Sequence, residues 1–155
     1  MTGVRTACVR RLVLTAILGA VGVGATGCAP AYSASGQLAQ SASDGSAQTR
    51  TGALTLRLAA SQRVPSPATD TALSDAIDKL EQDDSSVTSA DVSGTLDGAR
   101  RRILDRLRAS EDLLIHARLL VDAQAGSTEM DAVVRQLQAV AKQLTALEKQ
   151  LQGSG

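Results

Sequence analysis

The chain has 155 residues, 16 basic and 16 acidic side chains, and a single aromatic residue, Tyr32. This length allows one modest domain with additional segments, and the absence of excess positive charge argues against nucleic acid as a partner. With no Trp or Phe, one His and two Cys, the sequence lacks the stacking surfaces and metal-ligand clusters of many enzymes and ligand-binding proteins. We therefore expect no catalytic residue, no cofactor and no metal ion.

The N-terminal segment has the three parts of an export signal. Arg5, Arg10 and Arg11 precede an apolar run from Leu12 to Ala25, and small residues follow. The run is shorter than the roughly 20 residues that a membrane-spanning helix needs. The order of basic, apolar and small segments predicts a secretory signal peptide over residues 1–27. Its removal would leave 13 basic and 16 acidic groups, a net charge of −3.

Four residues, Ala25-Thr26-Gly27-Cys28, close this leader. They resemble the lipobox of bacterial lipoprotein signal peptides, in which a small residue precedes a cysteine. The resemblance covers the first 28 residues and departs from the family at Ala25, where leucine is usual. It implies cleavage between Gly27 and Cys28, attachment of a diacylglycerol to the Cys28 sulfur, and frequent acylation of the new amino group. Two acyl chains hold a protein stably on a membrane, whereas one binds only marginally.

A lipidated Cys28 would place the mature chain in the cell envelope, on the outer membrane or on the outer face of the plasma membrane. An aspartate directly after the lipidated cysteine would resemble an inner-membrane retention signal. This chain has Ala29 at that position, which favours the outer membrane in a cell with two membranes. The segment Ala29-Pro30-Ala31 offers an alternative, because a cut after Ala31 would release a soluble regulator or inhibitor. Cys8 lies within the leader, so the mature chain is expected to hold no internal disulfide.

Residues 28–66 are rich in Ser, Ala, Gly, Gln and Thr. Such a composition buries little apolar surface, so it predicts a flexible tether. A coil of about 36 residues would hold the folded part roughly 30 to 36 Å from the anchor. Within this segment Leu54, Leu56 and Leu58 alternate with polar residues, which predicts a short extended stretch.

Residues 67–152 show helical periodicity and predict an all-α domain, either a small bundle or an antiparallel hairpin with coiled-coil-like packing. The polar run from Asp83 to Ser86 is expected to end a first helix over residues 67–82. The apolar residues of this helix recur at helical spacing: Leu73, Ala76, Ile77 and Leu80.

A second helix is expected over residues 89–125. Thr88 and Asp91 have the spacing of a capping box, and Thr95 is an alternative cap. Gly126 is expected to end the helix in a left-handed conformation. The apolar face of this helix forms one narrow stripe: Val92, Leu96, Ala99, Ile103, Leu107, Ser110, Leu114, Ala117, Val121 and Ala125.

A third helix is expected over residues 128–152, and the short connection predicts that it packs antiparallel to the second. Such a domain has few bulky side chains, which favours a protein partner or a homo-oligomer. The apolar residues of this helix alternate in steps of three and four, which is the seam of a coiled coil: Met130, Val133, Leu137, Val140, Leu144, Leu147 and Leu151.

Five arginines form the most prominent charge cluster: Arg100, Arg101, Arg102, Arg106 and Arg108. They could bind an anionic partner such as lipid headgroups or an acidic wall polymer. We favour intramolecular pairing, because residues 70–91 hold seven acidic side chains and only Lys79 as a base. Within the second helix, Asp97 is also spaced to pair with Arg101, and Asp112 with Arg108.

The remaining polar candidates are interpreted as structural. His116 has no second metal ligand or nucleophile nearby in sequence, so a structural or interface role is expected. Glu111 and Asp112 are adjacent and diverge on a helix, so they do not form an acid and base pair. The sequence therefore predicts a lipid-anchored, non-catalytic envelope protein that acts as a helical structural or protein-interaction module.

Overall fold

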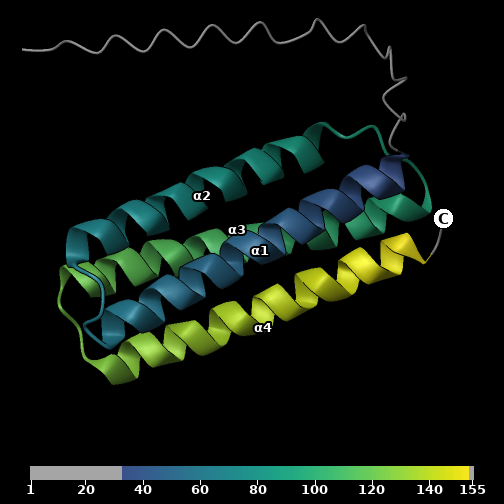
Figure 1. Ribbon diagram of the computed structural model, residues 1–155. Coiled ribbons are helices and arrows are strands. Elements are labelled where there is room, and N and C mark those ends of the chain that lie inside the picture. The colour runs from purple at the N-terminus through teal and green to yellow at the C-terminus, as the bar shows by residue number, and fades with distance from the viewer. Residues whose placement is uncertain (1–32, 154–155) are drawn as a thin grey trace, which may run out of the picture.

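The computed structural model describes residues 33–153, which form four helices and no strand. Successive helices run in opposite directions around one core, so the described chain is an up-down-up-down bundle (Figure 1). The predicted all-α helical bundle is confirmed, and it has one helix more than the periodicity indicated. The helices are α1 (Ala34–Ala60), α2 (Ser66–Ser89), α3 (Thr95–Asp122) and α4 (Ser127–Gln152).

The four helices are not equivalent in their packing. Helix α1 packs against all three others and most extensively against α4, whereas α2 packs against α1 and α3 only. One end of the bundle, the N-proximal end, holds the start of α1, the loop between α2 and α3, and the end of α4 (Figure 1). The opposite end, the far end, holds the other two connections.

The prediction of a flexible tether over residues 28–66 is wrong for residues 34–60, which form α1. Ser33 caps this helix, because its Oγ accepts a hydrogen bond of 3.2 Å from the backbone N–H of Gly36. The extended stretch predicted at Leu54 to Leu58 is also wrong, since these residues are helical. Of its three leucines, only Leu56 is fully buried. The buried residues of one α1 face recur in steps of four and three: Leu38, Ala42, Gly45, Thr49, Gly52 and Leu56.

This face of α1 is built from small residues because leucines of α3 occupy the space above it. A Cβ atom added at Gly45 would lie 2.3 Å from Leu107 Cδ2, and one added at Gly52 would lie 2.2 Å from Leu114 Cδ2. Both contacts are far shorter than van der Waals distance, so the glycines allow α3 to approach closely. The segment therefore folds because its small residues fit the leucines of α3, a property that its polar composition does not indicate.

Two buried hydroxyl groups of α1, those of Ser46 and Thr49, find partners inside the bundle. Thr49 Oγ1 lies 2.7 Å from the carbonyl oxygen of Gly45 and 2.9 Å from Ser110 Oγ on α3. Ser46 Oγ donates to the carbonyl oxygen of Ala141 at 3.1 Å and lies 2.9 Å from Thr145 Oγ1. Because these buried groups are hydrogen-bonded, their desolvation is offset and α1 tolerates them in its packed faces.

Helix α2 is longer than predicted. It continues through the polar run at Asp83 to Ser86, because Val87 is fully buried and extends the apolar stripe by a further two turns. The predicted capping box is also wrong, since Thr88 lies inside α2 and its hydroxyl bonds to Asp84 at 3.3 Å. Helix α3 begins at Thr95, after Gly94 takes a φ of 64°.

The seam of α4 and the central part of the predicted stripe of α3 are confirmed. The stripe is buried from Ala99 to Val121, and all seven seam residues of α4 are buried. Val92 and Ala125 lie outside α3 and, like Leu96, are only partly buried. The turn between the two helices differs from the prediction, because Gln124 takes the positive φ of 50°. Gly126 has an extended backbone with φ −66° and precedes α4 as its N-cap.

Candidate functional site

The predicted lipidation and cleavage residues, Cys28 and Gly27, lie outside the residues that the structure describes. The described chain begins five residues after Cys28, at the cap of α1. No helix of residues 33–153 is both long and apolar enough to cross a membrane.

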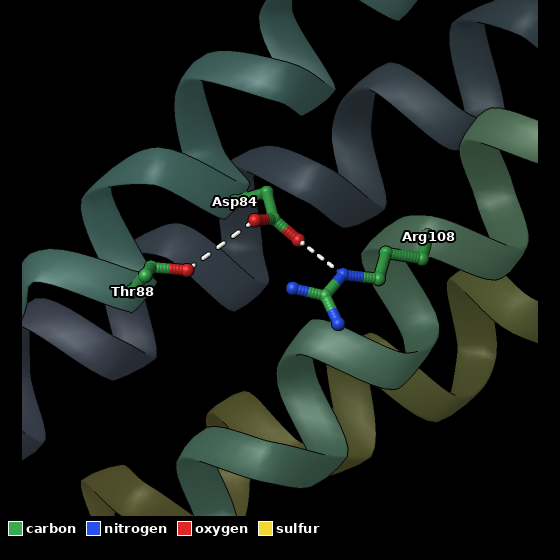
Figure 2. Close-up of polar contacts among 3 residues, drawn as sticks. All are labelled: Asp84, Thr88 and Arg108. Carbon is green, nitrogen blue, oxygen red and sulfur yellow. Dashed lines mark hydrogen bonds and ion pairs between the residues drawn. The ribbon is translucent and has the colours of Figure 1, made fainter.

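The most prominent polar contacts of the bundle join α2 to α3. Arg108 Nε donates to Asp84 Oδ2 at 2.9 Å, while Thr88 Oγ1 donates to the other carboxylate oxygen at 3.3 Å (Figure 2). The hydrogen bond to Asp84 and its negative charge raise the pKa of Arg108. Three turns further along α3, Arg118 Nε donates to Asp70 Oδ1 at 2.7 Å. Two ion pairs therefore connect α2 to α3 at two levels of the bundle.

The other arginines of the cluster are used differently from the prediction. Arg100 lies 3.9 Å from Asp97, and Arg102 Nε donates to the carbonyl oxygen of Gly98 at 3.3 Å. Within residues 33–153, neither the pair of Asp97 with Arg101 nor that of Asp112 with Arg108 is formed. Pairing of Arg108 with an acidic residue of the preceding helix was therefore predicted correctly. The two pairs predicted within α3 are not formed.

His116 is exposed on α3 and lines an open groove between α3 and α4. The groove also contains Asp112 and Leu113 from α3, and Glu129 and Gln136 from α4. Among the described residues there is no group of three or more His, Cys, Asp and Glu side chains that could hold a metal ion. The groove brings one imidazole near two carboxyl groups on an open surface, where water screens their charges.

A hollow of about 550 Å³ lies at the far end, between the two turns. Gln62 and Gln124 line it, and both have a left-handed backbone, with φ of 55° and 50°. Val64 and Met130 contribute apolar side chains to its lining. Since the described lining includes no ionisable side chain, this hollow offers neither an acid nor a base for chemistry.

A smaller hollow of about 280 Å³ lies between α1 and α2 and was missed by sequence reasoning. Asp44 of α1 and Asp83 of α2 both line it. Burial raises the pKa of Asp83 to about 6, and the negative charge of Asp44 adds to this effect. Gln40 Nε2 donates to both carboxylate oxygens of Asp44, at 2.9 and 3.0 Å, and so fixes that carboxylate. The two aspartates come together only because α1 is a helix. The pair was therefore missed when this segment was predicted to be a flexible tether.

Comparisons of the chain with protein-family models, with curated proteins and with solved structures found no match.

Proposed function

We propose that this chain is a non-catalytic helical protein of the bacterial cell envelope, held on a membrane by a lipid on Cys28. The observation that carries the proposal is the leader, in which arginines, an apolar run and small residues end at Cys28. The membrane is the outer membrane or the outer face of the plasma membrane. The alternative is a secreted regulator or inhibitor that begins at Tyr32.

The short stretch of sequence between Cys28 and α1 supports a position of the bundle close to the membrane. Four residues lie between Cys28 and Ser33, and the five Cα-to-Cα steps from one to the other span at most about 18 Å. A lipid on Cys28 would therefore hold the N-proximal end of the bundle next to the membrane surface. The 36-residue spacer expected from composition is replaced by a folded helix.

Binding of a partner protein is the proposed activity, and it would use the outer surface of the bundle. The α4 seam is buried within the bundle itself, so it is not free to form a coiled coil with another chain. Ile115 and Leu119 lie one turn apart on α3 and are exposed by 43% and 61%. Exposed apolar side chains of this kind favour a protein contact.

The anchor is tested by labelling cells with an alkyne fatty acid and by determining the mature N-terminus by mass spectrometry. We expect a labelled chain that begins at Cys28 and sediments with membranes. Cys28→Ser should abolish the label, while Cys8→Ser, a matched control within the leader, should retain it. An unlabelled chain that begins at Tyr32 would instead establish the secreted alternative.

The partner surface is tested by cross-linking in intact cells followed by affinity capture of the chain. The double variant Ile115→Ser/Leu119→Ser should lose its cross-linked species, whether the partner is another protein or a second copy. Leu54→Ser, which changes an exposed leucine on α1, is the control and should keep them. Identical cross-linked species in all three proteins would refute a contact through this part of α3.

A further inference from the structure

Charge is distributed unevenly along α3 and α4. The first half of α3, residues 95–108, and the last half of α4, residues 140–152, belong to the N-proximal half of the bundle (Figure 1). Together they carry seven basic and three acidic side chains, a net charge of +4. The other halves of the same helices, residues 109–122 and 127–139, carry two basic and five acidic side chains, a net charge of −3. This side of the bundle is therefore basic near the N-proximal end and acidic near the far end.

The fold leaves most of the N-proximal positive charge without an acidic partner. Arg100 and Arg108 are paired, with Asp97 at 3.9 Å and with Asp84 at 2.9 Å. The remaining basic side chains of the two N-proximal halves form no ion pair within residues 33–153, and together they make the basic surface: Arg101, Arg102, Arg106, Lys142 and Lys149. All are exposed except Arg106, which is half-buried. Unpaired, exposed positive charges of this kind attract an anionic partner.

The acidic side chains of the N-proximal half gather mainly on another helix. The second half of α2, residues 78–89, holds four acidic side chains and one lysine. Within residues 33–153, α2 packs against α1 and α3 but not against α4, so it lies diagonally opposite α4. Near the basic surface the unpaired acidic residues are Asp91, Asp105 and Glu148, which are fewer than its five basic residues. A flat anionic surface that approaches from the α4 side therefore meets mainly positive charge.

We propose that the basic surface docks on the anionic phospholipid headgroups of the membrane that anchors the chain. The orientation rests on the proposed lipid at Cys28, which would hold the N-proximal end, the end that carries the basic surface, next to the bilayer. Arg101 and Arg102 follow the start of α3 by six and seven residues, and Lys149 precedes the end of α4 by three. At a rise of 1.5 Å per residue, all three lie within about 11 Å of their helix ends. This is close to the Debye length of about 8 Å at physiological ionic strength, so their attraction reaches the headgroups.

The bundle would then stand on its N-proximal end and lean toward α3 and α4. Leaning brings Arg106 and Lys142 closer to the headgroups, whereas the acidic far halves of the same helices are repelled and limit the tilt. Each Lys or Arg near an anionic membrane strengthens the association roughly fivefold. Ile115 and Leu119, in the far half of α3, would stay clear of the bilayer and open to a protein partner.

The test measures the partition onto vesicles of the chain from Cys28 to Gly155, which retains all four helices and their shared core. Cys28 is the only thiol of this chain, so a maleimide can attach one myristoyl-length acyl chain to its sulfur. One such chain binds only marginally, which makes an added electrostatic contribution measurable. In about 0.1 M NaCl, vesicles of phosphatidylcholine with one third phosphatidylglycerol should bind at least tenfold more tightly than phosphatidylcholine alone, and about 0.5 M NaCl should remove the difference. Equal binding to both kinds of vesicle would overturn the proposal.

Matched variants separate the basic surface from a general effect of charge. One variant removes the three exposed charges nearest the N-proximal end: Arg101→Gln, Arg102→Gln and Lys149→Gln. Its control removes three exposed charges from the far half: Arg57→Gln, Arg63→Gln and Arg135→Gln. Binding to the phosphatidylglycerol vesicles should fall by about tenfold to a hundredfold in the first variant and by less than twofold in the control. Circular dichroism checks that both fold, and equal losses of binding would refute a localised surface.

The three lysines of the chain report which side contacts the membrane. Lys142 and Lys149 belong to the basic surface, whereas Lys79 is exposed on α2. On phosphatidylglycerol vesicles, acetylation by an N-hydroxysuccinimide ester should slow at least threefold at Lys142 and Lys149 and stay unchanged at Lys79, as measured by mass spectrometry of the peptides. Equal rates at all three lysines would contradict the orientation.

An acidic polymer is the other anionic partner to distinguish. Retention of the chain on immobilised polyglycerol phosphate, without tighter binding to phosphatidylglycerol vesicles, would assign the basic surface to a polymer and overturn membrane docking. Because the acyl chain on these vesicles is attached chemically, the vesicle result does not depend on lipidation in cells. A missing alkyne label with intact vesicle binding would refute the anchor alone, and a labelled chain indifferent to phosphatidylglycerol would refute docking alone.

Discussion

Helices α1 and α4 pack against each other with the same repeat but with opposite kinds of side chain. The buried positions of α4 are large and aliphatic, from Met130 to Leu151, in steps of three and four. Those of α1 follow the same steps, yet include Gly45, Thr49 and Gly52. The small α1 residues lie against Leu107 and Leu114 of α3, so the comparison shows that large side chains on neighbouring helices can supply most of the volume around a helix of small residues.

The largest effect is expected from removing volume on the α4 side. Leu144 is fully buried, and its Cδ1 would lie 3.6 Å from a Cβ at Gly45. Leu144→Ala should lower the free energy of unfolding by about 3 kcal/mol, because it leaves a cavity that the small α1 residues cannot fill. Urea unfolding at pH 7.5 measures this. Ala146→Ser, on the exposed face of α4, should change it little, and equal losses would mean that α4 is not packed as described.

Adding volume on the α1 side should be nearly as damaging. Gly45→Leu forces a side chain into the space of Leu107, so we expect a loss of about 2 kcal/mol from overpacking. Ala47→Leu adds a larger side chain on the exposed face of the same helix and should be close to neutral. Truncating the side chain that occupies this space should compensate in part, so Gly45→Leu combined with Leu107→Ala should lose less than the sum of the two single losses. A loss equal to the full sum would contradict volume matching.

A smaller effect is expected at the hydroxyl pair that joins α1 to α3. Thr49→Val preserves shape but removes the contact with Ser110 at 2.9 Å, leaving that buried hydroxyl without its partner. The free energy of unfolding should fall by about 1.5 kcal/mol. Combining it with Ser110→Ala should restore part of the loss in the same urea titration. Thr51→Val, whose hydroxyl is exposed, is the matched control.

The smallest effect concerns the polar side of α1, where Asp44 faces Asp83. The pKa of Asp83 is about 6 in the folded chain, above its ordinary value of 3.8, so the folded state binds the proton more tightly than the unfolded state. Its contribution to stability is present below pH 3.8 and is lost as pH rises through about 6. Because Asp83 is only half-buried, we expect a change on the order of 1 kcal/mol in cation-free buffer.

The measurement is urea unfolding at several pH values between 4 and 7 in the presence of EDTA. Asp83→Asn should remove this part of the pH dependence, whereas Asp75→Asn on the exposed face should keep it. A pH profile unaffected by Asp83→Asn would mean that the two aspartates do not interact as the packing of α1 on α2 requires.

Sequence reasoning succeeded where large apolar residues recur and failed where small residues form the core. Ile103, Leu107 and Leu114 mark their own helix face, so the stripe of α3 was predictable. Gly45 and Gly52 become core positions only because Leu107 and Leu114 lie above them, which is a property of another segment. Periodicity within one helix cannot reveal a partner of complementary shape.

The candidate sites divide in the same way. An acidic partner for Arg108 was predictable from the charge of residues 70–91, but the choice of Asp84 depends on the register between two helices. The pair of Asp44 and Asp83 required α1 to be a helix, so no local signal could identify it. Lipidation at Cys28 depends on a local motif alone, and it stays a prediction because it lies outside residues 33–153.

The start of α1 and the end of α4 lie at the same end of the bundle (Figure 1), which determines where probes can be attached. Gln152 is the last residue of α4. With the proposed anchor, an epitope tag after this residue would be placed beside the bilayer and shielded from antibodies. The turn near Gln62 follows a helix of 27 residues, about 40 Å long. An insertion there would carry the epitope away from the lipid surface, so surface staining of the two tagged proteins reports the orientation of the bundle.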